Sequence, residues 1–202
     1  MLRRSIALGV VVTLAAHMVP VAACAQPPRR IARVGVLSAG SAPDARVDEF
    51  RHGLRELGYI EGQNVAITYR WADGHQDRLP ELAAQLVASQ VDVIVAMGPS
   101  AWAAKRQTST IPIVIAFSGD PVGAGIVSNL ARPGTNITGL SFMSSDLAAK
   151  RVELLKQAMP RITRIAVLNN PLEPSTAPEM RETEAGARAR GGAPVAGGPP
   201  TR

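Results

Sequence analysis

Residues 91–117 read VDVIVAMGPSAWAAKRQTSTIPIVIAF. Their pattern predicts a strand, then a helix, then a second strand. Val91–Met97 is a short apolar run rich in β-branched residues, which is typical of a strand buried on both faces. Gly-Pro-Ser at 98–100 breaks the run, a short helix is predicted at 101–108, and residues 111–117 form another apolar run. This order predicts two parallel strands in one sheet.

The same alternation extends in both directions along the chain. Further strands are predicted at 31–37, 65–70, 136–142 and 165–168, and further helices at about 47–57, 76–89, 122–130 and 146–159. In the last helix the spacing predicts that Leu147, Leu154, Leu155 and Ala158 face inward. Strict βα alternation favours an α/β fold, a doubly wound parallel sheet with helices on both faces.

The first 25 residues predict export, because Arg3 and Arg4 precede an apolar run that ends in Ala23-Cys24-Ala25. Residues 1–25 are therefore interpreted as a signal peptide, and a periplasmic or other extracytoplasmic location is expected. Two processing routes stay open: simple cleavage after Ala25, or lipoprotein processing that leaves a lipid-bearing Cys24 as the first residue. Either route leaves no cysteine for a disulfide, since the chain has only one.

Charge and composition argue against a nucleic-acid partner. Removal of residues 1–25 lowers the formal charge from +6 to +4, and aromatic residues make up 3% of the chain. A dense basic face or aromatic platforms would be expected of a nucleic-acid-binding protein. Residues 186–202 hold five glycines and three prolines, a composition that predicts a disordered tail.

Catalytic motifs are weak, so we expect no enzymatic activity, no cofactor and no metal site. Ser100 follows a strand as in a nucleophile elbow, but Trp102 stands where the second glycine belongs. His52 and His75 have no second ligand at metal spacing. Gly123 and Gly125 imitate a dinucleotide fingerprint in the wrong βα unit, and we expect them to serve close packing of a helix on the sheet.

Small polar residues gather where the predicted strands end. Because the carboxyl ends of parallel strands share one edge, these residues are candidates for holding a ligand at helix starts. Asp120 is suited to pair with an amine or a hydroxyl. The alternative, that they are helix caps and turn residues, stays open. The candidate ligand-binding residues are Ser38, Ser41, Gly98, Ser100, Asp120, Ser141, Asn169 and Asn170.

Several stretches resemble a family of substrate-binding proteins of ABC importers. They are GLRELGYIEGQNVAITYRWADG at 53–74, LAAQLVASQVDVIVAMGPSAWAAKRQTSTIPIV at 82–114, IVIAFSGDPVGAGIVSNLARPGTNITGL at 113–140 and KRVELLKQAMPRITRIAVLNNP at 150–171. The resemblance implies a periplasmic-binding-protein-like (type I) fold of two lobes. It also implies a small organic solute, in some members an aromatic or branched amino acid, held between the lobes and passed to ABC permease subunits in the membrane.

By this resemblance residues 31–140 form the first lobe and residues 141–185 an incomplete second lobe. Ser38, Ser41, Ser100 and Asp120 would lie on the first lobe's side of the cleft, and Asn169 and Asn170 would begin the second lobe's side. Members of the family are longer, so we expect a C-terminally truncated chain that binds solute weakly or not at all. The alternatives are an exported α/β hydrolase and a solute-sensing module without a transport role.

Overall fold

The computed structural model describes residues 31–171, 173–191 and 196–197. The predicted signal peptide, Cys24 and most of the predicted tail lie outside these residues. The main strands are β1 (Ala32–Ser38), β2 (Val65–Trp71), β3 (Val93–Met97), β4 (Ile113–Phe117) and β5 (Ile137–Gly139). The helices are α2 (Ala45–Glu56), the 3-10 turn η1 (Gln76–Arg78), α3 (Leu79–Ala88), α4 (Ser100–Gln107), α5 (Ser144–Ala158) and α6 (Thr176–Arg188).

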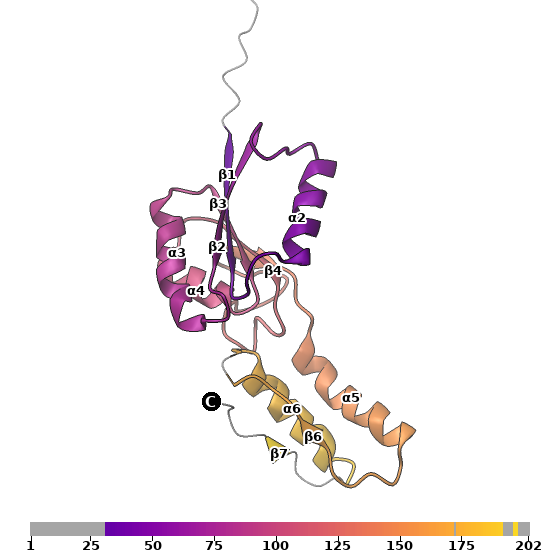
Figure 1. The fold of residues 1–202 in the computed structure, drawn as a ribbon. Coiled ribbons are helices and arrows are strands. Elements are labelled where there is room, and N and C mark those ends of the chain that lie inside the picture. The colour runs from indigo at the N-terminus through magenta and orange to yellow at the C-terminus, as the bar shows by residue number, and fades with distance from the viewer. Residues whose placement is uncertain (1–30, 172, 192–195, 198–202) are drawn as a thin grey trace, which may run out of the picture. The chain divides into compact units, whose positions relative to one another are not determined.

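The five main strands form one parallel sheet in the order β2-β1-β3-β4-β5. The chain turns outward from β1 to β2 and then crosses back to β3, so the sheet has a topological switch point between β1 and β3. Helix α2 covers one face, and α3 and α4 cover the other (Figure 1). The predicted α/β class with a parallel sheet is confirmed.

The two faces of β1 explain why helices cover both sides. Val36 packs in the cluster that includes Val47 of α2, whereas Leu37 packs in the cluster that includes Leu86 of α3. Both strand residues are fully buried, as the continuous apolar run predicts. Gly35 lets α3 approach closely, since a Cβ at this position would lie 3.0 Å from Cδ2 of Leu86.

The helix predicted at 122–130 is wrong, because the structure has turns there. Pro121 follows β4 closely, and the carboxylate of Asp120 accepts a hydrogen bond from Gly123 N at 2.7 Å. Gly125 then adopts a left-handed φ of 72°, which is incompatible with continued helix. The two glycines therefore serve turns, and the expectation that they pack a helix on the sheet is also wrong.

The second half of the chain differs from the predicted pattern in its strand and in the buried face of its helix. The strand expected at 165–168 shortens to β6 (Ala166–Val167), which pairs with β7 (Ala196–Gly197) outside the main sheet. Helix α5 lies beside α6 (Figure 1). Helix α6 reaches Arg188, two residues beyond the start expected for the tail.

The face of α5 that packs inward is made of small residues, so the predicted inward face is wrong. Leu147 and Leu154 are 47% and 52% exposed, Ala158 is exposed as well, and only Leu155 of the four predicted residues is half-buried. The buried residues of α5 are Ser144, Ser145, Ala148 and Val152. Apolar spacing indicates a stripe on a helix but not which neighbour covers it, and here α6 covers the stripe of smaller side chains.

Candidate functional site

The carboxyl ends of the main strands bring four loops to one edge of the sheet. Ser38 is paired with Met97 in the β1–β3 register, and Met97 with Phe117 in the β3–β4 register. The residues that follow these strands and β5 therefore lie side by side. This edge, the rim, comprises residues 38–41, 98–101, 117–120 and 140–145.

Several predicted site residues on the rim have local structural partners. Ser38 Oγ accepts a hydrogen bond from Gly40 N at 3.1 Å, and Ser141 Oγ accepts one from Met143 N at 3.0 Å. Asp120 holds the turn described above, and Ser41 is exposed. These contacts agree with the interpretation as turn residues. In Asp120, one carboxylate oxygen accepts the hydrogen bond of the turn, and this bond also fixes the direction of the second oxygen.

Three buried serine hydroxyls at helix starts have no hydrogen-bond partner among the described residues. They belong to Ser100, at the first turn of α4, and to Ser144 and Ser145, at the first turn of α5. A buried hydroxyl left unpaired costs about 1–3 kcal/mol, so such groups call for a functional explanation. Gly98, just before α4, has a left-handed φ of 60° and packs against Phe117.

An aromatic pair with a cation beside it stands on the rim, and sequence reasoning missed it. The rings of Phe117 and Phe142 stack with centroids 6.0 Å apart, and Phe142 is 63% exposed. The guanidinium of Arg46 lies 4.9 Å from the centroid of Phe117. Phe117 is the last residue of β4, and Phe142 ends the strand expected at 136–142, although β5 itself ends at Gly139. Two of the chain's three phenylalanines at the ends of consecutive predicted strands are the signal that could have found them.

The carboxylate of Asp44 fixes Arg46 in this position. Its two oxygens accept hydrogen bonds from Arg46 Nε at 2.9 Å and Nη2 at 2.7 Å. The side-chain hydrogen bond with Arg46 lowers the pKa of Asp44, and the same bond raises the pKa of Arg46. Asp44 also caps α2 by accepting from Arg46 N, so the helix start and the cation are held by one side chain.

Gly119 is the point where the rim meets the starts of α5 and α6. A Cβ on Gly119 would lie 2.6 Å from Ser175 Oγ and 2.9 Å from Ser144 Oγ, so neither hydroxyl could keep its place. Gly119 O accepts a hydrogen bond from Ser144 N at 2.9 Å. The missing side chain therefore allows the two helix starts to approach the loop after β4.

Asn169 and Asn170 line a cavity of about 240 Å³ together with Glu173, Ser175 and residues of α6. Burial raises the pKa of the Glu173 carboxyl, and a hydrogen bond with Ser175 opposes that shift. Ser175 belongs both to this cavity and to the contact with Gly119. The structure thus joins the predicted asparagines to the rim through one serine, and Glu173 and Ser175 are additions that the sequence analysis did not make.

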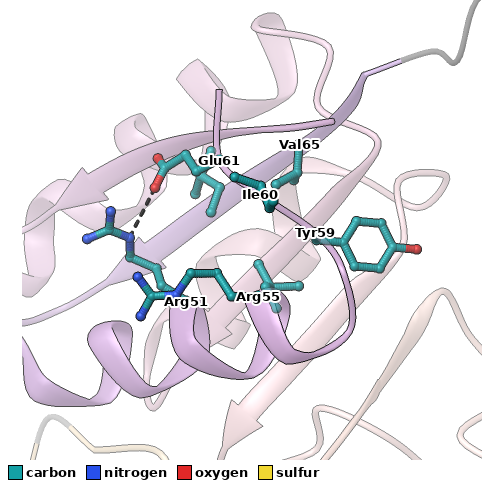
Figure 2. A pocket seen from close by; sticks show the side chains of 8 residues that line it. Arg51, Arg55, Tyr59, Ile60, Glu61 and Val65 are labelled. Carbon is teal, nitrogen blue, oxygen red and sulfur yellow. Dashed lines mark hydrogen bonds and ion pairs between the residues drawn. The ribbon is translucent and has the colours of Figure 1, made fainter. Parts of the chain in front are cut away.

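Two further cavities are lined by other residues, and the second of them reaches the rim at Pro99. One, of about 150 Å³, lies at the amino end of β2, where the side chains of Arg51 and Glu61 pair at 3.0 Å (Figure 2). It holds none of the predicted site residues. The other, of about 320 Å³, lies beside α4 and is lined by Trp102 and three prolines, Pro80, Pro99 and Pro174.

Metal-ligating side chains are scattered over the described part of the chain. Residues 31–171, 173–191 and 196–197 contain no group of three or more His, Cys, Asp or Glu placed to hold a metal ion. Among the helices of the same residues, none is both long and apolar enough to cross a membrane.

A parallel sheet with a switch point, polar helix starts along its carboxyl edge and an exposed aromatic pair define a lobe of the periplasmic-binding-protein kind. The chain belongs to the ABC transporter substrate binding protein family, whose sequence model matches residues 32–191. The family consists of non-enzymatic binding proteins, which confirms the prediction that this protein is not an enzyme. Substrate-binding proteins of this family typically work outside the cytoplasm.

Comparison with individual proteins supports this assignment. The chain is 36% identical over 126 residues to the tyrosine-binding protein of Clostridioides difficile, a match covering 61% of this chain and 36% of that protein. A conserved domain protein of Vibrio cholerae has 35% identity and a TM-score of 0.76 over 84% of this chain and 58% of its own. The ABC domain from Streptococcus pneumonia in complex with L-Trp has 31% identity and a TM-score of 0.72, over 82% of this chain and 56% of its own.

The chain therefore spans between about one third and three fifths of the length of these relatives.

Proposed function

We propose that this protein captures a small amino acid with an aromatic side chain and delivers it to the permease subunits of an ABC importer. The rim supplies the first side of the binding cleft, and residues 169–176 supply part of the second side. Family membership supports the transport role. The tyrosine and tryptophan in the names of two relatives support the class of solute.

The observation that carries the proposal is the exposed aromatic pair at the rim. The outer ring, Phe142, is stacked on Phe117, so its orientation is fixed before a solute arrives. An aromatic solute that stacks on such a pair gains about 0.5–1.5 kcal/mol beyond the burial of apolar area. The ring of Phe142 loses most of its 63% exposure in such a complex.

The starts of α4 and α5 form the polar part of the proposed binding site on the rim. Donors at helix starts favour a carboxylate, because the backbone dipoles there also attract negative charge. The eight predicted site residues remain part of this proposal, with Ser38 and Ser141 placed mainly as turn residues.

Delivery and location complete the proposed function. Closure of two lobes about a hinge traps the solute, and the closed form docks on the permease. Export depends on residues 1–25, with Cys24 as the site of attachment to the membrane if the lipoprotein route is used. Gly119 is the position at which closure would be most sensitive to a side chain, because Ser144 and Ser175 already approach it.

Calorimetric or NMR titration with L-tyrosine, L-tryptophan, L-leucine and L-alanine tests the proposal. Weak but saturable binding is expected for the aromatic amino acids, in line with the weak binding that the family resemblance implies for this chain. Phe142→Ala should weaken it further by about 3- to 10-fold, the value of an aromatic contact. Leu57→Ala is the matched control, since Leu57 is 76% exposed and lies at the carboxyl end of α2, opposite the end that holds Arg46. Equal affinity for L-alanine and L-tyrosine, or binding of none of the four, would refute the proposed function.

A further inference from the structure

The cavity beside α6 contains a carboxylate whose charge is not balanced. Glu173 is half-buried and lines the cavity with Asn169 and Asn170. Among the described residues no Lys, Arg or His forms an ion pair with it. The hydroxyl of Ser175, which is itself buried, opposes the rise of the Glu173 pKa that burial causes.

The second carboxylate of the cavity is in a different situation. Glu179 Oε1 accepts a hydrogen bond from Arg151 Nη1 at 2.7 Å, so its charge is balanced by a guanidinium from α5. Burial of a carboxylate without a cation is unfavourable, and the raised pKa of Glu173 reflects this cost. The cavity thus holds one carboxylate that is already paired and one for which the described residues supply no cation.

We infer that Glu173 binds the α-ammonium group of the amino-acid solute, an inference that rests on the proposed function. An ammonium group supplies both the positive charge and the donors that the carboxylate lacks. The side-chain carbonyl of Asn169, whose amide nitrogen donates to Met180 Sδ, lies on the same cavity and can accept from one of the remaining N–H groups.

The position of the cavity suits a solute that also reaches the rim. Ser175 lines the cavity, and its Oγ lies against Gly119 on the loop after β4. The volume of about 240 Å³ accommodates the polar end of an amino acid. A solute with its ammonium group at Glu173 would therefore lie close to the loop after β4 and have its other groups near the rim.

Three related compounds and two variants test the inference. L-tyrosine carries both charged groups, tyramine only the amine, and 3-(4-hydroxyphenyl)propanoate only the carboxylate. In the unmodified protein, removal of the amine should weaken binding by at least about 10-fold, the value of a hydrogen bond to a charged group. Glu173→Gln should weaken binding of L-tyrosine and tyramine by about 10- to 100-fold and leave that of the propanoate within about 3-fold.

Glu184→Gln on α6 is the matched control, because that carboxylate is paired with Arg188 and does not line the cavity, and it should change each affinity by less than about 3-fold. Glu173→Gln should be at least as stable as the unmodified protein at pH 7, since it removes a charge that burial disfavours. Unchanged L-tyrosine affinity in folded Glu173→Gln, or equal affinity of the unmodified protein for L-tyrosine and the propanoate, overturns the role of Glu173 and leaves the proposed function intact. Failure of the unmodified protein to bind any of the three compounds overturns both.

Discussion

Replacement of Gly186 by alanine should destabilise the contact between α5 and α6. A Cβ at position 186 would lie 2.8 Å from the Cα and 3.3 Å from the carbonyl oxygen of Ala149. These are backbone atoms of α5, so they cannot rotate away as a flexible side chain would. To restore an ordinary contact of 3.4 Å the helices would have to separate by about 0.6 Å along this line, which breaks close packing over the whole interface.

The magnitude follows from two opposing effects. Overpacking typically costs about 1–3 kcal/mol, and a backbone neighbour favours the upper end of that range. Alanine in place of glycine inside a helix returns about 1 kcal/mol. The net expectation is a loss of about 1–2 kcal/mol in the free energy of unfolding.

Gly53 provides the matched control, because it is also helical and a Cβ at this position would have no heavy atom within 4 Å. Gly53→Ala should therefore stabilise the protein by about 0.5–1 kcal/mol. Urea unfolding followed by far-UV circular dichroism measures both variants, and hydrogen exchange of the α6 amides locates the effect. A Gly186→Ala variant at least as stable as the unmodified protein would refute the packing described for the two helices.

Three further predictions concern a charge, a turn and processing. Because hydrogen bonding lowers the pKa of Asp44, its ion pair contributes stability above the unfolded pKa of about 4, which is lost as the pH falls through the folded pKa. Urea unfolding should therefore show a deficit for Asp44→Asn, which keeps a capping oxygen, at pH 7 and a smaller deficit at pH 3. Asp120→Asn can still accept the hydrogen bond from Gly123 N, so it tests the charge alone. It should weaken solute binding by about 1.5–3 kcal/mol, the value of a hydrogen bond to a charged group. Unchanged affinity of the folded variant in calorimetry would remove Asp120 from the site. Intact mass of the exported protein should show either an unmodified chain that begins at Gln26 or a diacylglycerol-bearing chain that begins at Cys24, and each result excludes the other route.

The sheet was predictable from the sequence because its strands are buried on both faces. Short continuous apolar runs at β1, β3 and β4 are each ended by small or turn-forming residues. This pattern favours buried strands over helices. The region after β4 was not predictable in this way. Its apolar spacing resembles a helix, but the hydrogen bond from Gly123 N to Asp120 and the left-handed Gly125 direct the chain into turns.

The site was predictable only in its position. Strand ends identify the rim, and Ser100 and Asp120 lie there as expected, but residue type alone does not show which hydroxyl is already bonded. The contact of Phe117 with Arg46 joins elements far apart in the sequence, so spacing could not show it. Glu173 and Ser175 were missed for the same reason, since their importance depends on a cavity and on the approach of α6 to Gly119.

Mapping of solute contacts by NMR tests the central claim, that the rim and the adjoining cavity hold the solute. L-tyrosine added to ¹⁵N-labelled protein should shift the amide signals of residues 98–101, 117–120, 141–145 and 169–176. Signals around the cavity of Figure 2, at Arg51, Tyr59 and Ile60, should stay in place. Shifts centred on the cavity of Figure 2 would contradict the account. So would the absence of any saturable shift at L-tyrosine concentrations up to about 10 mM, a limit that corresponds to a binding free energy of about 3 kcal/mol.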